Sequence, residues 1–230
     1  MKQTDILLIN LLMDLLANAE NSGTCGPNLR WLLTDNGVLI ISGKGEMNDY
    51  SFDNRSPRSK SDIKRIIIGD GVTTIGSSAF DNCSNLTSVA IPNSVTEIGF
   101  RAFEDCRALT SINIPNSVTE IGDYAFYNCS ELTSVTIPNS VTRIGDLAFS
   151  GCRSLKNFTF GSGLRSIGQE AFSDCINITQ ISSEAVVPPI CDSGAFYGIN
   201  KYKCKLIVPK NRLHSYQWAY QWGDFLLIEG

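Results

Sequence analysis

The sequence predicts a right-handed solenoid built from 23-residue coils, and three series of residues support that prediction. An Ile-Gly pair, an Ala-Phe pair and a cysteine each recur every 23 residues, while the polar positions between them vary. A fixed period that is kept by the apolar positions is typical of a chain in which each coil packs only against its neighbours. The series are Ile75, Ile98, Ile121, Ile144 and Ile167; Phe80, Phe103, Phe126, Phe149 and Phe172; and Cys83, Cys106, Cys129, Cys152 and Cys175.

Each coil is expected to open with a short strand. In the unit that starts at Leu86, Val89 and Ile91 alternate with small residues, so both side chains should face inward. Pro92 has no N–H to donate to a sheet and should end the strand. Stacking these strands gives one parallel sheet on the concave side of about six coils, with short turns or 3₁₀ segments on the convex side.

The repeated pattern LxxLxLPxxLxxIgxxAFxxC resembles the treponemal-type, or BspA-like, leucine-rich repeats of bacterial surface proteins, over residues 63–180. Gly69 and Gly161 stand where the pattern has proline. The stretches 22–50 and 204–229 look like the caps that such proteins carry in gut bacteria. The resemblance implies an α/β-type leucine-rich repeat solenoid in a secreted or cell-surface protein that takes part in adhesion or host interaction.

The N-terminal part divides into two segments. Residues 1–19 fit either a signal peptide, with a small-x-small cleavage signal at Ala17-Asn18-Ala19, or a helix that covers the first coil. Residues 20–62 form the N-terminal cap. Asn36-Gly37 between two apolar runs predicts a hairpin with a type I′ turn, in which both central residues have positive φ. This hairpin should pair with or cover the first strand of the array.

The array is expected to cover residues 63–177, and residues 178–230 to form a degenerate repeat and a C-terminal cap. Ser183 stands where an apolar residue is due, and Ala195-Phe196 arrives one residue late. The cap should contain a strand at Leu206–Val208, a helix that begins at the N-cap Asn211, and a last strand at Phe225–Ile228.

The net charge of −4 argues against general nucleic-acid binding. Residues 66–200 hold six basic and thirteen acidic residues, whereas basic stretches precede and follow the array. These stretches are either solvated parts of the caps or a site for an anionic partner. The C-terminal stretch contains Lys201, Lys203, Lys205, Lys210 and Arg212.

No catalytic residues, metal site or cofactor are predicted. The chain contains none of the short motifs that mark nucleophilic, metal-dependent or nucleotide-binding enzymes, and its one histidine, His214, is expected at the surface. No segment is long and apolar enough to be a transmembrane helix, and the oligomeric state is not predicted. Two functions remain: a module that binds a protein or glycan, or an accessory domain that serves an enzyme without a catalytic site of its own.

Five of the eight cysteines occupy one position of the repeat. Stacked equivalent residues lie about 4.8 Å apart with parallel side chains, whereas a disulfide needs converging Cβ atoms. A column of buried free thiols is therefore expected. Cys191 and Cys204 lie outside this column and are candidates for a disulfide if the protein is exported, and Cys25 has no evident partner.

Two sets of surface residues are candidate binding sites. Residues that alternate with the buried positions of each strand should form a small, polar, uncharged face on the concave side, although β-propensity explains part of this composition. They are Ser88, Ser111, Asn113, Ser134, Thr136, Asn157, Thr159 and Gln180. The second set, Phe100, Tyr124, Tyr127 and Leu147, is either an exposed contact patch or a scatter of surface residues.

Overall fold

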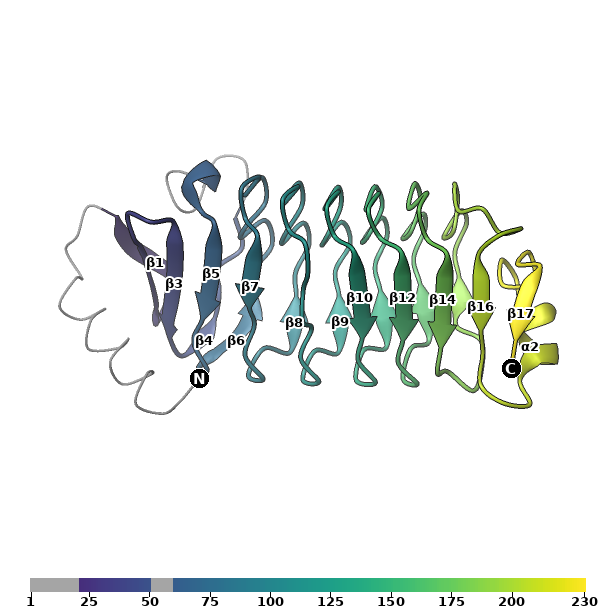
Figure 1. Cartoon of the computed structure of the whole chain (residues 1–230). Helices are drawn as coiled ribbons and strands as arrows, with labels where there is room; N and C mark the ends of the chain where they lie inside the picture. The colour runs from purple at the N-terminus through teal and green to yellow at the C-terminus, as the bar shows by residue number, and fades with distance from the viewer. Residues whose placement is uncertain (1–20, 51–59) are drawn as a thin grey trace.

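The computed structural model describes residues 21–50 and 60–230 of the chain. The predicted signal peptide or capping helix at residues 1–19 lies outside these residues. The chain winds into a solenoid of about eight turns with 23-residue spacing, stacked in a single row (Figure 1). The predicted class of fold is therefore confirmed, and the caps add turns to the six coils expected.

One side of the solenoid carries the longer strands, and we call it the long-strand face. Its strands form two five-stranded sheets, in the orders β1-β2-β3-β5-β7 and β10-β12-β14-β16-β17. The coil between them contributes only an isolated bridge from Ser111 to Ser134, so the predicted continuous sheet is interrupted there. The array strands are β5 (Arg65–Ile68), β7 (Ser88–Ala90), β10 (Ser134–Ile137), β12 (Asn157–Phe160), β14 (Gln180–Ser183), β16 (Lys205–Ile207) and β17 (Leu227–Glu229).

A second parallel sheet of seven short strands runs along the opposite side, behind the first in Figure 1. The sequence predicted only turns or 3₁₀ segments here, because a two-residue strand is too short to show an alternating pattern. The described 3₁₀ helix, η1 (Lys60–Asp62), precedes the array. The second sheet consists of β4 (Gly45–Glu46), β6 (Val72–Ile75), β8 (Glu97–Ile98), β9 (Glu120–Ile121), β11 (Arg143–Ile144), β13 (Ser166–Ile167) and β15 (Ile190–Cys191).

The turns of the array contain left-handed residues that are not glycine. Arg101, Tyr124 and Leu147, at the same position of three units, have φ between 51 and 59°. The N–H of Tyr124 donates to the carbonyl of Asp146 in the following coil at 2.8 Å. In the second sheet, by contrast, the N–H of Gly122 donates to Ile98 in the preceding coil at 2.8 Å. Backbone N–H groups of one coil thus donate hydrogen bonds to both the preceding and the following coil. These hydrogen bonds explain why left-handed geometry is tolerated at bulky residues.

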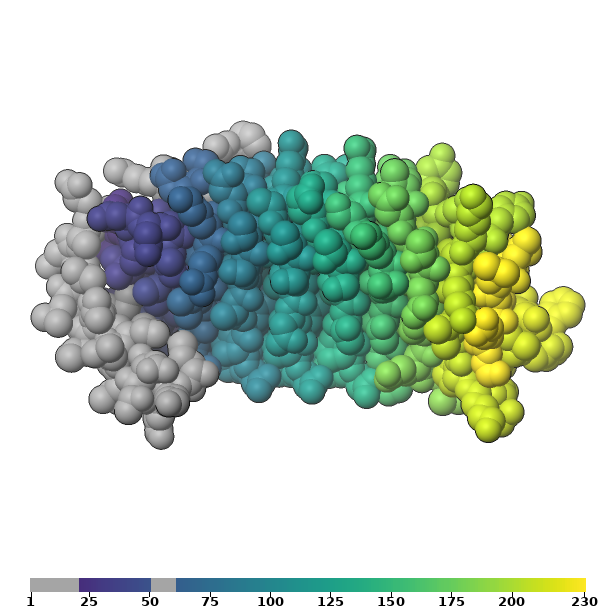
Figure 2. Space-filling model, viewed as in Figure 1, coloured from purple at the N-terminus to yellow at the C-terminus, as the bar shows by residue number. Residues whose placement is uncertain are grey.

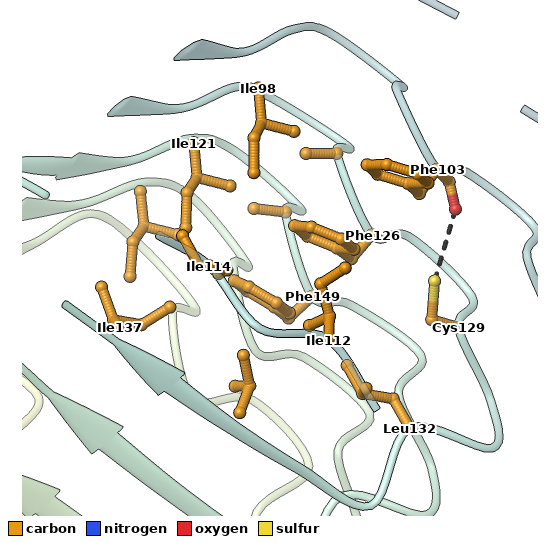
Figure 3. Packing of buried hydrophobic residues seen from close by; sticks show 14 of the residues in the cluster. Ile98, Phe103, Ile112, Ile114, Ile121, Phe126, Cys129, Leu132, Ile137 and Phe149 are labelled. Carbon is orange, nitrogen blue, oxygen red and sulfur yellow. Dashed lines mark hydrogen bonds between the residues drawn. The ribbon is translucent and has the colours of Figure 1, made fainter. Parts of the chain in front are cut away.

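The core between the two sheets is built around a column of phenylalanine rings (Figure 3). Neighbouring rings from Phe80 to Phe172 stack with centroids 5.0 to 5.3 Å apart. Phe196 continues the column at 6.0 Å from Phe172, despite arriving one residue late in the sequence. Each ring therefore packs against both neighbouring coils, as the 23-residue period requires.

The glycine after each core isoleucine allows close approach of the coils. A Cβ on Gly122 would lie 2.8 Å from the carbonyl carbon of Gly99 and 2.9 Å from the nitrogen of Phe100. Gly122 does not have positive φ, so a left-handed backbone is not the reason for glycine at this position. The glycine is needed because the preceding backbone occupies the space of a side chain.

Changing Gly122 to alanine is expected to lower the free energy of unfolding by about 1–3 kcal/mol, the usual range for an overpacked core. Urea unfolding followed by circular dichroism measures this. Asn116→Ala, at an exposed turn position of the same coil, is the matched control and should change stability by no more than about 0.5 kcal/mol. Equal midpoints for the two variants would contradict the close-approach explanation.

The N-terminal cap contains three antiparallel strands, β1 (Ser22–Gly26), β2 (Leu29–Leu33) and β3 (Val38–Gly43). The predicted hairpin is confirmed, and β3 pairs in parallel with β5, so the hairpin covers the first strand of the array. The predicted type I′ turn is wrong. Gly37 has a φ of 83° but Asn36 is not left-handed, and the N–H of Gly37 donates to Thr34 at 2.9 Å. The longer loop needs only one left-handed residue.

The C-terminal cap closes the core with aromatic side chains. Helix α2 (Leu213–Gln217) has its N-cap at Arg212, so the prediction of Asn211 is wrong; Asn211 is left-handed, with a φ of 65°. Tyr216 of this helix is buried, and its hydroxyl lies 2.6 Å from that of Ser183 and donates to Ala185 at 2.8 Å. Tyr216 of the cap thus supplies the hydrogen-bond partner for Ser183, the polar residue that stands at an otherwise apolar repeat position.

Candidate functional site

The outward side chains of the long-strand face form two columns that run across the strands. Strand register places Ser134, Asn157 and Gln180 side by side in the first column. Thr136, Thr159 and Ser182 form the second column in the same strands. Because parallel strands lie about 4.8 Å apart, each column offers one polar group per coil at regular spacing.

The structure places the remaining predicted residues at the edges of this surface. Ser111 bridges to Ser134 and extends the first column, and Asn113 is exposed in the interrupted coil. Ser88 belongs to the other half of the face, where it pairs with Arg65. All eight predicted residues are at least partly exposed. The structure therefore brings six of them together on β10, β12, β14 and the preceding coil, and leaves Ser88 and Asn113 outside the paired columns.

Hydrogen bonding separates the face from the structural threonines beside it. Thr133 Oγ1 donates to the carbonyl of Thr110 in the preceding coil at 3.2 Å, and Thr179 Oγ1 donates to Lys156 at 3.3 Å. The side chains of Ser134, Thr136 and Asn157, in contrast, make no hydrogen bond with another described residue. Their hydroxyls and amide are free to bind a ligand. This difference could not be read from composition, because both sets contain the same residue types.

Charge is absent from the centre of the face and present at its ends. Arg65 precedes Ser88 in the first column, and Lys205 follows Gln180 and forms an ion pair with Glu229 at 2.8 Å. An extended ligand could therefore lie across β10, β12 and β14 without stripping water from an unpaired charge, which is a costly step in binding.

Three of the four residues of the predicted apolar patch gather at the turns. Ring centroids lie 5.8 Å apart for Phe100 and Tyr124 and 5.6 Å apart for Tyr124 and Tyr127. Leu147 occupies the unit position of Tyr124 in the following coil and is half-buried. The guanidinium of Arg101 lies 4.8 Å from the Phe100 centroid and 5.1 Å from that of Tyr124. Sequence reasoning missed Arg101, although it occupies the same unit position as Tyr124.

Arg101 also links the patch to a carboxylate. Its Nε lies 3.5 Å from Glu104 Oε2. Burial raises the pKa of Glu104, and the nearby guanidinium of Arg101 opposes that shift. The patch is therefore a packed arrangement of rings around a cation that is held by a cation–π contact and an ion pair.

The cysteine column is confirmed as a series of buried free thiols. Cys129 Sγ donates to the carbonyl of Phe103 in the preceding coil at 3.3 Å (Figure 3), and Cys106, Cys152 and Cys175 each make the same contact with the coil before their own. These four thiols thus add a second hydrogen bond to carbonyls that already accept a backbone N–H, and they have no access to solvent.

The predicted disulfide between Cys191 and Cys204 is wrong, because both residues are free and buried. Cys191 lies on β15 of the second sheet, whereas Cys204 directly precedes β16 of the long-strand face. Each thiol instead approaches a carbonyl of its own segment, Pro189 at 3.7 Å and Lys205 at 3.9 Å.

All eight thiols are expected to resist a disulfide-exchange reagent at about pH 8, because burial keeps the reagent from reaching the sulfur atoms. Burial raises the pKa of Cys25 and of Cys191 to about 12, and that of Cys204 to about 11, from an ordinary value of 9.0. Thiol titration of the native protein checks this, and the protein in denaturant is the control. Fast reaction of any thiol in the native protein would contradict the structure. A count of two thiols fewer than eight in denaturant without reductant would also contradict it, because it would indicate a disulfide.

The described residues contain no group of three His, Cys, Asp or Glu side chains that could hold a metal ion. His214 is exposed on α2, with its ring centroid 6.0 Å from that of Trp218. Among the helices of residues 21–50 and 60–230, none has the length and apolar character needed to cross a membrane.

Comparison with known proteins gives matches to leucine-rich repeat proteins of bacteria. A family model described as the BspA type leucine rich repeat region, in six copies, matches residues 46–179 and 119–217. A leucine-rich repeat protein of T. pallidum is 25% identical, with a TM-score of 0.54, over 69% of this chain and 81% of that chain. One from Eubacterium ventriosum is 26% identical, with a TM-score of 0.53, over 83% and 67%. No curated protein matches the chain.

Proposed function

The chain belongs to the BspA type leucine-rich repeat family, and from this we propose that it is a binding module that holds a protein or glycan against its long-strand face. The observation that supports the proposal is the pair of polar columns on β10, β12 and β14. Ser134, Thr136 and Asn157 make no side-chain hydrogen bond with another described residue, whereas Gln180 donates to Ser182 within β14 at 3.3 Å. The structural threonines next to these columns use their hydroxyls inside the fold. The module itself is proposed to be non-catalytic.

A solenoid suits this task because its surface is rigid before the ligand arrives. Backbone hydrogen bonds between coils hold the columns in place, so little conformational entropy is lost on binding. An extended peptide or a linear glycan can run across several coils and meet one hydroxyl or amide in each. The family resemblance supports a location outside the cell or at the bacterial surface, with adhesion or contact with a host as the biological role.

The double change Asn113→Lys with Thr136→Lys is expected to abolish ligand binding, because it puts one long charged side chain in the second column and another beside that column, in the preceding coil. A glycan array and an array of purified extracellular proteins identify the ligand of the unchanged protein, and titration then gives the affinity of the variant. The circular dichroism spectrum and melting temperature should stay nearly unchanged, since both positions are exposed.

Asn93→Lys with Asn116→Lys is the matched control, because it adds the same charge at exposed turn positions outside the two columns. Its affinity should equal that of the unchanged protein. Binding that survives the Asn113 and Thr136 changes, or is lost equally in the control, would place the site elsewhere or show a general charge effect.

A further inference from the structure

The exposed apolar side chains of this protein are concentrated at one end. Eleven large apolar residues are exposed in the described part of the chain, and ten of them lie between Ile176 and Leu227. Six of these, Tyr197, Tyr202, Trp218, Tyr220, Leu226 and Leu227, belong to the C-terminal end. In Figure 2 this yellow end projects in separate lobes beyond the outline of the coils.

The segments that carry these six residues are packed together. The N–H of Leu226 donates to Lys201 at 3.1 Å, and β17 pairs with β16 through Leu227 and Lys205. Trp222 Nε1 donates to Pro189 at 2.8 Å and so ties the segment after α2 to the coil before it. The exposed residues thus belong to one compact end of the solenoid.

The core of the cap does not need them. Tyr216, Trp222 and Phe225 are buried and close the phenylalanine column, whereas Trp218 is 80% exposed and Tyr220 69% exposed. Terminal repeats of a solenoid normally have a polar outer face that keeps the end soluble. Exposed aromatic residues at this position therefore indicate a contact surface.

The same end is basic, although the rest of the array is acidic. Residues 201–230 hold five basic and two acidic residues, against six basic and thirteen acidic in residues 66–200. The two acidic groups pair with Lys201 and Lys205 at 2.8 Å. Lys203, Lys210 and Arg212 are exposed and make no ion pair with another described residue. Three cations therefore remain to meet an anionic partner.

We propose that the C-terminal end of the solenoid binds the surface of an anionic lipid bilayer. Tryptophan and tyrosine favour the interface between headgroups and hydrocarbon, where an apolar ring and a polar tip are both accommodated. Lysine and arginine at the same end are attracted to anionic headgroups. A second copy of the chain fits this end less well, since a symmetric contact would bring the unpaired cations of two copies together.

Sedimentation with vesicles tests the proposal on the full chain, using phosphatidylglycerol mixed with phosphatidylcholine and, for comparison, phosphatidylcholine alone. Binding to the anionic vesicles only is expected, and the emission of Trp218 should shift to the blue. The triple variant with Lys203→Gln, Lys210→Gln and Arg212→Gln should bind the anionic vesicles about a hundredfold more weakly. This corresponds to about fivefold for each cation that is removed. Trp218→Ser with Tyr220→Ser should abolish the emission shift.

The array offers matched controls for both changes. Arg153→Gln, Lys156→Gln and Arg165→Gln remove three exposed cations from the array, and Phe100→Ser with Tyr127→Ser removes two of its aromatic residues. Both control variants should bind like the unchanged protein. The proposal is overturned if the unchanged protein does not bind, or if the controls lose as much binding as the test variants. It is also overturned if the protein does not bind vesicles but self-associates in solution, and Trp218→Ser with Tyr220→Ser abolishes that self-association. In that case the C-terminal end would be a contact between copies of the chain.

Discussion

Replacing Phe126 with alanine is expected to lower the free energy of unfolding by about 3–5 kcal/mol, which is the range for deleting a large buried aromatic side chain. The ring has no exposure to solvent and stacks on Phe103 at 5.3 Å and on Phe149 at 5.0 Å. Alanine would leave a cavity between two coils, and the inter-coil hydrogen bonds on both sides limit how far those coils can close it.

Urea unfolding of the purified variant measures this loss, and Phe100→Ala is the matched control. Phe100 is 43% exposed and lies outside the column, so its removal should cost less than about 1 kcal/mol. A cost below about 1 kcal/mol for Phe126→Ala would show that the column is not the main core.

The second large effect is expected at the C-terminal cap, where Trp222→Ala should also cost about 3–5 kcal/mol. Trp222 is fully buried, with its ring centroid 4.9 Å from Phe196 and 5.4 Å from Tyr216. Its removal also leaves the carbonyl of Pro189 without the indole donor. Because coils in a solenoid contact only their neighbours, the loss should spread from this end into the array.

Trp218→Ala is the control for this change, four residues away in the same cap. Trp218 is exposed, so the variant should unfold at nearly the same urea concentration as the unchanged protein. Hydrogen exchange of the two variants locates the effect, and we expect faster exchange in β14 and β16 only for Trp222→Ala. Equal stability of the two tryptophan variants would contradict the proposed closure of the core.

The repeat period made the array predictable from sequence. Isoleucine, phenylalanine and cysteine series define the buried positions, and the structure buries them in stacked coils. Alternation around Val89 and Ile91 indicated the strands of the long-strand face, although the coil at 111–114 forms only a bridge. The second sheet was not predictable in this way, because Glu97-Ile98 and its equivalents in the following coils are two residues long and carry no alternation.

Details that depend on contacts between distant segments could not be predicted. Ser183 looked like a break in the pattern, and its partner is Tyr216, which lies 33 residues later. The conditional disulfide between Cys191 and Cys204 was inferred from position in the sequence and the oxidising environment, whereas the fold places Cys191 in the second sheet and Cys204 just before a strand of the long-strand face. For the candidate site, alternation identified the outward residues. Only the hydrogen bonds separated the free hydroxyls from the structural ones.

The constant register between coils has a consequence for how the length of the array can change. The segment Pro-Asn-Ser-Val-Thr occurs unchanged at residues 92–96, 115–119 and 138–142, so neighbouring units are equivalent at this segment. Loss or duplication of one 23-residue unit rejoins equivalent positions and conserves the contacts between coils. Each such event would change the length of the polar columns by about 4.8 Å. Removing or adding a whole coil would therefore shorten or lengthen the long-strand face without any new fold.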